Sequence, residues 1–499
     1  MLQLPAGREA SLGEAAPQYA RHRPERTLLY QLVEEYYPVF EAQWAAEGRV
    51  LPDYVRQEFD EYLKCGCLEH GFLRVQCGTC HAEHLVAFSC KRRGFCPSCG
   101  ARRMAESAAL LVDEVLPHKP VRQWVLSVPY QLRFLFASQP QIMGKALGIV
   151  YRTIATHLIR KAGYTRTTAH TGAVTLIQRF GSALNLNIHF HMLFLDGVYI
   201  DDAGSAQFRW VKAPTSGEFN QLAYIIAHRL ARYLERQGLL ERDAEHSYLA
   251  LESADEDPMD QLRGHSITYR IAVGSQQGRK VFTLKTLPDE RDAAELMVAT
   301  TGNVAGFSLH AGVAAKASQR DKLERLCRYI ARPAISEKRL SLTNQGKVRY
   351  ELKTPYRDGT THVIFEPVDF IAKLAALVPK PRVNLTRFHG VFAPNSKHRA
   401  LVTPAKRGKG GKPEAADGQD EQPPVQRHAA MTWAQRLKRV FSIDVERCRI
   451  CGGSARVIAC IEDPVVIKKI LMHLEEKAPT RATPLLPDSR APPQSSLFG

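Results

Sequence analysis

Two histidines placed two residues apart could bind a metal ion together. Residues 184–195 alternate, with every even-numbered position apolar and with His189 and His191 at positions between them. Successive side chains of a strand point to opposite faces, so the pattern predicts a buried strand with both imidazoles on one face. Such a pair is preorganised as metal ligands. The alternative is a pair of partly buried, hydrogen-bonded histidines that bind no metal.

Cysteines with metal-ligand spacing form a second group. Seven of the eleven cysteines fall between Cys65 and Cys99. The pairs Cys77/Cys80 and Cys96/Cys99 are C-x-x-C knuckles, and we expect them to close one tetrahedral zinc site. The ligands left for a second site are Cys65 and Cys90, with Cys67, His70, His81 and His84 nearby. The alternative, reduced buried thiols, would leave this short polar segment without a core.

A further C-x-x-C pair, Cys448 and Cys451, lies in a small module near the C-terminus, followed by Cys460. Three cysteines without a clear fourth ligand leave zinc binding open there.

A tyrosine surrounded by arginines could attack a phosphodiester. Residues 318–331 have the apolar period of a helix, and Tyr329 lies at the edge of its apolar stripe. Arg325 and Arg332 are beside it, and Arg328 is a little further round. The alternative is an ordinary boundary tyrosine on a solvated basic helix.

The charge balance indicates a polyanionic partner. The 499 residues include 68 Lys and Arg against 51 Asp and Glu, a net charge of +17. Nucleic acid is the leading candidate, because cationic contacts to phosphates dominate such affinity. A membrane surface is the weaker alternative, since no apolar run is long enough to span a bilayer. Lys91, Arg92 and Arg93 stand beside a knuckle and are expected to face DNA or RNA. Zinc thiolates and the lack of a signal-peptide-like start suggest a reducing cytosol.

Periodicity predicts an α+β protein with an antiparallel sheet. We expect strands at 121–129 and 173–180, helices at 26–44, 105–116, 141–163 and 219–240, and hairpins at 265–287 and 347–366. The predicted domains are a zinc-binding domain at 25–104, a nuclease domain at 105–400, a linker at 401–430, a Cys-containing module at 431–476 and a disordered tail at 477–499.

Five motifs, in this order, resemble those of a known family. They are the segment 89–99 (SCKRRGFCPSC), the strand 187–191 (NIHFH), the helix 326–333 (LCRYIARP), the turn 354–362 (TPYRDGTTH) and the segment 387–390 (RFHG). Together they resemble the rolling-circle transposases of the HUH (His-hydrophobic-His) class, specifically insertion-sequence family ninety-one and its common-region relatives. The resemblance covers roughly residues 63–474.

The resemblance implies a nuclease domain whose paired histidines hold a divalent metal and whose helix presents a nucleophilic tyrosine. By position, His189 and His191 would bind Mg²⁺ or Mn²⁺, and Tyr329 would form a 5′-phosphotyrosine with single-stranded DNA at transposon ends. We choose His310 as the third ligand because it is a histidine shortly before the tyrosine helix. Many members have a second tyrosine four residues after the first, where this chain has Pro333, so it looks like the single-tyrosine kind. The implied location is the bacterial cytoplasm, in association with the nucleoid.

Two other functions are compatible with these residues. A rolling-circle replication initiator would use the same chemistry for a different role. A non-enzymatic zinc-ribbon regulator would use the basic surface and the zinc knuckles, with a merely structural histidine pair. A metal-dependent hydrolase of small substrates fits the histidines but gives no reason for the basic excess.

Overall fold

The fold is taken from a computed structural model, in which the chain divides into two units. The smaller unit contains residues 1–24, 64–89 and 429–488, and the larger one 25–63, 90–428 and 489–499. The structure describes residues 23–202, 205–242, 247–249, 257–286, 301–406, 435, 438–439, 446–448 and 450–476. Most of the predicted linker, the predicted tail and part of the Cys-containing module lie outside the described residues.

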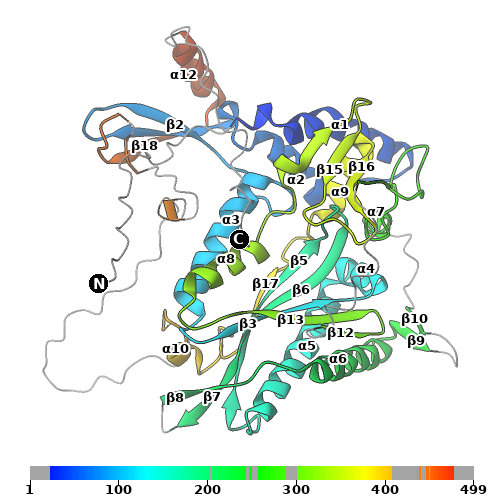
Figure 1. The fold of residues 1–499 in the computed structure, drawn as a ribbon. Coiled ribbons are helices and arrows are strands. Elements are labelled where there is room, and N and C mark those ends of the chain that lie inside the picture. The colour runs from blue at the N-terminus through cyan, green and yellow to red at the C-terminus, as the bar shows by residue number, and fades with distance from the viewer. Residues whose placement is uncertain are drawn as a thin grey trace, which may run out of the picture. The chain divides into compact units, whose positions relative to one another are not determined.

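The larger unit is built on a six-stranded antiparallel sheet (Figure 1). In spatial order its strands are β12 (Thr301–Val304), β13 (Phe307–Ala315), β3 (Val121–Ser127), β6 (Leu186–Leu195), β5 (Gly172–Phe180) and β17 (Thr386–Gly390). The predicted strands at 121–129, 173–180 and 184–195 are confirmed as the three neighbouring strands β3, β5 and β6. Mixed helices and antiparallel strands agree with the predicted α+β class.

Three helices cover the sheet face to which the even-numbered, apolar side chains of β6 point. They are α4 (Tyr130–Ser138), α5 (Pro140–Lys161) and α6 (Ser216–Arg236). Phe190 of β6 stacks on Phe136 of α4 with ring centroids 6.0 Å apart, and Phe194 stacks on Tyr151 of α5 at 5.7 Å. Each buried aromatic side chain of this kind contributes about 2 to 3 kcal/mol, so this face fixes β6 in the core.

The opposite face of β6, which presents the histidines, is covered by α3 (Pro97–Leu110), the π-helical turn Leu111–Val115 and α8 (Arg320–Ile330). Figure 1 shows α3 and α8 side by side on this layer. Leu193 and Leu195 of β6 belong to one buried cluster with Leu323, Leu326 and other residues of α8. The predicted helix at 318–331 is thus confirmed, and its apolar stripe packs on the sheet.

A second, four-stranded sheet has the order β11-β16-β15-β14. Its strands are β11 (Phe282–Lys285), β14 (Leu340–Leu342), β15 (Val348–Glu351) and β16 (Thr360–Phe365). The pairing of β15 with β16 confirms the predicted hairpin at 347–366. The predicted hairpin at 265–287 is confirmed around its turn, where Arg270 and Lys280 form an antiparallel bridge, but residues 265–267 are the end of a helix, α7 (Pro258–Ile267). Asp257 caps that helix by accepting a hydrogen bond from the Met259 backbone.

The other helices and small sheets complete this unit. They are η1 (Pro24–Arg26), α1 (Leu28–Ala46), α2 (Asp53–Lys64), η5 (Glu337–Arg339), α9 (Pro367–Leu377), α10 (Arg399–Val402), the sheet β4-β7-β8 (Ala169–His170, Gly197–Asp202, Ser205–Trp210) and the pair β9-β10 (Leu240–Arg242, Ser247–Leu249).

The smaller unit has a three-stranded antiparallel sheet of order β18-β1-β2. Its elements are η2 (Leu68–His70), β1 (Phe72–Cys77), β2 (Glu83–Ala87), β18 (Ala455–Ile461) and α12 (Pro464–Glu476). Of the predicted zinc-binding domain at 25–104, residues 64–89 group with the C-terminal part of the chain and the rest, apart from residues at the boundary, with the larger unit. None of the helices in the described part of the chain has the length and hydropathy of a membrane-spanning segment.

Candidate functional site

His189 and His191 stand next to each other on the face of β6 that α8 covers. Their ring centroids are 4.8 Å apart. The Nδ1 atom of His189 lies 2.9 Å from the Asn187 carbonyl oxygen, and that of His191 lies 2.7 Å from the side-chain amide of Gln123. An Nδ1–H that donates to an oxygen leaves Nε2 with its lone pair. The contact with the Asn187 carbonyl oxygen fixes the Nδ1–H tautomer of His189. His191 has the same tautomer when the Gln123 amide is flipped, because the amide oxygen then accepts from Nδ1–H.

Burial keeps both imidazoles neutral. Removal from water, with smaller effects of Arg332 and Arg133, lowers the pKa of His189 to about 4. The pKa of His191 is also far below its usual value, through burial and the nearby His189 and Arg332. The Nε2 atom of His191 is buried and has no hydrogen-bond partner among the described residues. A neutral imidazole pair with an unpartnered buried nitrogen fits a divalent metal ion.

His310 shares this face of the sheet but is one strand further away. His191 and His310 are both paired with Val125 of β3, from opposite sides. Strand spacing puts their backbones roughly 10 Å apart. The potential ligand groups among the described residues do not combine His310 with the pair. His310 as third ligand therefore stays a prediction, and it would have to reach across β3.

Tyr329 is held between two cations near the end of α8. The Arg332 guanidinium carbon and the Lys353 Nζ each lie 4.3 Å from the centroid of its ring. Tyr329 lines a cavity of about 270 Å³ together with Arg332, Arg339, Lys353 and Tyr356. Cations at this distance interact favourably with an aromatic ring.

Gln178 and Arg332 connect the tyrosine helix to the histidine strand. Gln178 is paired with His189 across strands β5 and β6. Its Nε2 donates to the carbonyl oxygen of Ile330 at 3.0 Å, and its Oε1 accepts from Arg332 at 3.4 Å. Arg332 also donates to the Tyr329 carbonyl oxygen at 2.8 Å. Neither Gln178 nor Lys353 was predicted from the sequence as a site residue. A polar residue within the apolar strand 173–180 was the available signal for Gln178.

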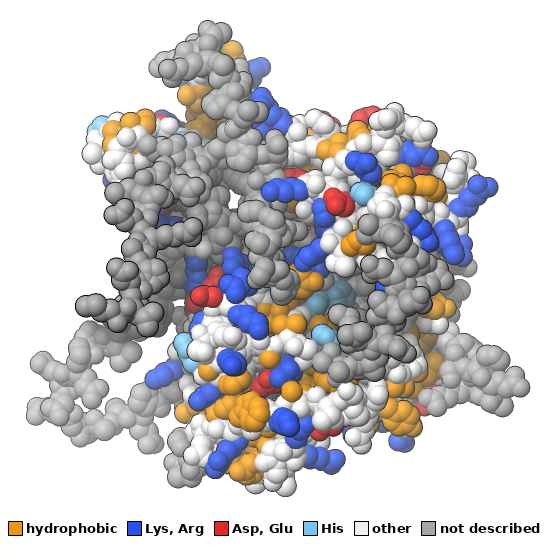
Figure 2. All heavy atoms as spheres, in the orientation of Figure 1, with side chains coloured by type: hydrophobic (Ala, Val, Ile, Leu, Met, Phe, Trp, Pro, Cys, Tyr) orange, Lys and Arg blue, Asp and Glu red, His pale blue; other side chains and the backbone are white. Residues whose placement is uncertain are grey.

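The basic residues predicted to bind DNA differ in their surroundings. Arg325 is exposed on α8 and Arg328 is half-buried, whereas Lys91 is exposed and Arg92 donates to Gln57 at 3.5 Å. Figure 2 shows Lys and Arg side chains spread over the visible face, with fewer acidic ones among them.

Arg93, whose role in DNA binding stays a prediction, has hydrogen-bond partners within the protein. Its guanidinium donates to the carbonyl oxygens of Val383 at 2.6 Å and Lys380 at 3.4 Å. The structure therefore gives this guanidinium partners within the protein, where it joins the segment beside a knuckle to the chain after α9.

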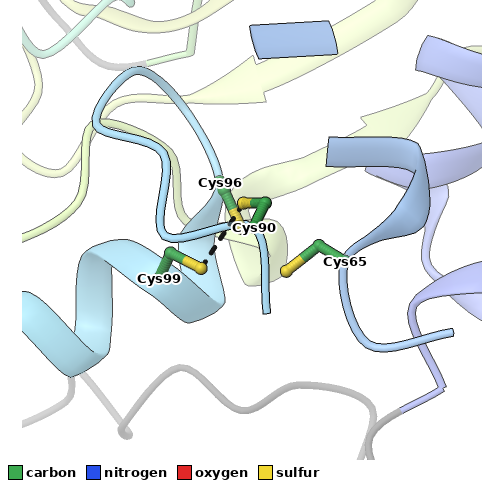
Figure 3. A group of neighbouring side chains, drawn as sticks. All are labelled: Cys65, Cys90, Cys96 and Cys99. Atoms are coloured by element: carbon green, nitrogen blue, oxygen red, sulfur yellow. Dashed lines mark hydrogen bonds between the residues drawn. The ribbon is translucent and has the colours of Figure 1, made fainter. Parts of the chain in front are cut away.

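One cysteine group gathers Cys65, Cys90, Cys96 and Cys99, whose sulfur atoms all lie within 4.8 Å of one another (Figure 3). Cys90 and Cys99 approach to 3.4 Å, and the Lys91 backbone donates to the Cys99 sulfur at 3.2 Å. Cys96 and Cys99 bracket the start of α3, where the helix dipole favours thiolates.

The other group combines Cys77 and Cys80 with Cys448 and Cys451. The predicted pairing of Cys77/Cys80 with Cys96/Cys99 is therefore corrected. Spacing identified the knuckles but could not show which of them meet. Backbone N–H groups of Cys80 and Thr79 donate to the Cys77 sulfur and lower its pKa to about 6. The other nearby candidates, Cys67, His70, His81, His84 and Cys460, belong to neither group.

Two segments of the chain match models of known protein families. Residues 172–400 match a family described as "Putative transposase", and residues 32–128 match a "Transposase zinc-binding domain" of the IS91 type. No curated protein and no solved structure gives a significant match. The zinc-binding match agrees with the cysteine groups and supports structural zinc. The order of a zinc-binding segment followed by a transposase segment is the one expected from the motifs, and the chain is a member of the IS91 family of transposases.

Proposed function

We propose that this transposase cleaves and rejoins single-stranded DNA at transposon ends, with Tyr329 as the nucleophile, in rolling-circle transposition. One observation carries the proposal. The helix that presents Tyr329 packs on the same sheet face that presents His189 and His191, and Gln178 and Arg332 connect the two. A regulator with merely structural histidines would not need a tyrosine held between two cations on the helix that covers the histidine face.

In the proposed reaction the phenol oxygen of Tyr329 attacks the scissile phosphorus. A bond forms between that oxygen and phosphorus, and the bond from phosphorus to the 3′-oxygen breaks. The phenol gives up its proton to solvent, and the departing 3′-oxygen takes one. The product is a 5′-phosphotyrosine and a free 3′-hydroxyl, so the phosphodiester energy is kept and rejoining needs no nucleotide.

The charged residues around Tyr329 would act on this step. Lys353 and Arg332, each 4.3 Å from the ring centroid, would hold the ring of Tyr329 in place by cation–π interactions. Arg332, with Arg325 or Arg328, would counter the charge that grows on the phosphate oxygens. His189 and His191, neutral through burial, would hold Mg²⁺ or Mn²⁺, with His310 as the predicted third ligand. When bound, that ion would polarise the scissile phosphate.

The chain would work with a single tyrosine at this helix, because the position four residues after Tyr329 is Pro333. We propose that one phenol handles each cleavage in turn. Membership of a transposase family favours transposition. No observation on this chain separately favours replication initiation.

The test is to incubate the protein with single-stranded DNA carrying the element's end and with Mn²⁺, to denature it, and to locate the adduct by mass spectrometry. A nucleotide on the peptide that contains Tyr329 supports the proposal. An adduct on another residue, or none with DNA that the protein binds, would refute it.

A further inference from the structure

We propose that Cys77, Cys80, Cys448 and Cys451 bind a zinc ion of their own, and that this ion joins residues 446–476 to residues 64–89 as two halves of one zinc ribbon. The family match to a zinc-binding domain ends at residue 128, so it does not include the second half. All four cysteines lie in the smaller unit.

The sulfur positions fit one tetrahedral ion. Cys77 Sγ is 3.5 Å from Cys451 Sγ, and Cys80 Sγ is 3.5 Å from Cys448 Sγ. Four sulfurs about 2.3 Å from a tetrahedral zinc ion would be about 3.8 Å apart, so the four thiols already have nearly the required spacing. Each of these two close pairs consists of one sulfur from the first knuckle and one from the second.

The backbone of both knuckles is folded as a thiolate site requires. In the first knuckle, the Thr79 N–H donates to Cys77 Sγ at 3.3 Å, and in the second, the Ile450 N–H donates to Cys448 Sγ at 3.4 Å. Such bonds stabilise the charged sulfur. The same arrangement thus occurs in two segments more than 360 residues apart.

A glycine marks where the two knuckles touch. A Cβ on Gly453 would lie 2.5 Å from Thr79 Oγ1 and 3.1 Å from Cys77 Sγ, so only glycine lets the second knuckle approach the first this closely. The Gly78 N–H donates to the Ser454 carbonyl oxygen at 2.9 Å. Cys77 and Ala455 are then the first pair of the β1–β18 ladder.

The second half of the proposed ribbon, residues 446–476, buries little apolar surface. Val457 of β18 is 56 % exposed and Val465 of α12 is 62 % exposed. Among the described residues from 446 onward, Ile467 is the one hydrophobic side chain that is buried. A segment with so small a core depends on its metal, because binding free energy then becomes folding free energy. The ion would therefore decide whether residues 446–476 stay attached.

The experiment measures zinc content per chain by mass spectrometry of the metal in the purified full-length protein. The double variant Cys448→Ser/Cys451→Ser should contain one zinc ion fewer than the natural chain, and so should Cys77→Ser/Cys80→Ser. The matched control is Cys460→Ser, because Cys460 is exposed on the same β18 but belongs to neither group. It should change nothing. An unchanged zinc content in both double variants would overturn the proposal.

Limited trypsin digestion tests the attachment. Cleavage after Arg456, within β18, should speed up at least tenfold in both double variants, while the larger unit stays resistant. If the zinc content falls by one but Arg456 remains as protected as in the natural chain, the ion binds there but does not hold the two halves together, and that part of the proposal is wrong.

Discussion

Gln178 donates a 3.0 Å hydrogen bond from its side-chain amide to the backbone carbonyl oxygen of Ile330, the residue after Tyr329. Gln178 is also the β5 partner of His189. One buried side chain thus sets the end of the tyrosine helix relative to the strand that carries the histidines. A displacement of about 1 Å between reacting groups can cost a factor of 10², so this bond bears on the proposed reaction.

Replacement of Gln178 by alanine should slow adduct formation about 10- to 100-fold, because the end of α8 loses its link to β5. Metal binding should be retained, since the histidines keep their own partners. The measurement is the single-turnover rate of covalent adduct formation at saturating DNA. The control is Gln207→Ala on exposed β8. A rate equal to that of the natural chain would show that Gln178 does not position Tyr329.

Tyr329→Phe should reduce adduct formation by more than about 10³-fold, because the attacking oxygen is removed. Binding of single-stranded DNA should persist. Tyr356 lines the same cavity and bonds through its hydroxyl to Tyr269 and Ser182, so Tyr356→Phe is the matched control and should leave the adduct in place. If Tyr329→Phe still formed the adduct, Tyr356 would be the first residue to search for it.

His191→Ala should remove binding of Mn²⁺, measured by electron paramagnetic resonance, together with metal-dependent cleavage. Gln123→Ala should weaken Mn²⁺ binding roughly 10- to 100-fold, because the His191 ring loses the partner that orients it. Mn²⁺ binding and cleavage that survive in His191→Ala would refute the metal assignment.

Arg325 and Arg93 should respond differently to truncation. Arg325→Ala should weaken binding of single-stranded DNA and reduce the slope of log affinity against log salt by about 0.7, as for one lost phosphate contact. Arg93→Ala should leave that slope unchanged. It should lower the free energy of unfolding by about 2 kcal/mol, because the guanidinium donates hydrogen bonds to the Val383 and Lys380 carbonyl oxygens. Fluorescence anisotropy at several salt concentrations and urea unfolding measure the two effects. Equal salt slopes for the natural chain and Arg325→Ala would exclude the phosphate contact.

Stability of the larger unit should rise with pH between about 4 and 6.5. Burial and nearby Arg387 lower the pKa of His389 to about 4 from its ordinary 6.5. In this window the unfolded chain therefore binds a proton at His389 that the folded chain does not bind. The contribution of His389 to the free energy of unfolding is complete above pH 6.5 and is lost as the pH falls towards 4. The shift corresponds to about 3 kcal/mol. His389→Gln should reduce the pH slope in urea unfolding, whereas His118→Gln at an exposed site should not. An unchanged slope in His389→Gln would contradict the assignment.

Local periodicity predicted the strand and the helix that carry the candidate site residues. The alternation in residues 184–195 places His189 and His191 correctly because a strand's faces follow from its own sequence. The tyrosine helix was found for the same reason. Alternation cannot show which strands are neighbours, so the strand β3 between His191 and His310 was not foreseen.

The zinc knuckles show where sequence spacing stops being informative. The cost of closing a loop grows only slowly with its length, so proximity in sequence is a weak guide to which knuckles meet. Cys77/Cys80 therefore has a partner from the far end of the chain, although Cys96/Cys99 is much nearer in sequence. The overlap of α7 with the start of the predicted hairpin at 265–287 was avoidable, because Asp257-Pro258 is a helix start signal.

The distance along the chain between the two knuckles also matters on the ribosome. Cys80 and Cys448 are 368 residues apart, and translation at about 5 to 20 residues per second would take about 20 to 70 s to make the intervening chain. During that time Cys77 and Cys80 emerge with Cys96 and Cys99 as the only other complete C-x-x-C pair. If the proposed ribbon holds zinc, any metal complex formed earlier between these two pairs would have to be released first, and that release would limit how fast the ribbon forms.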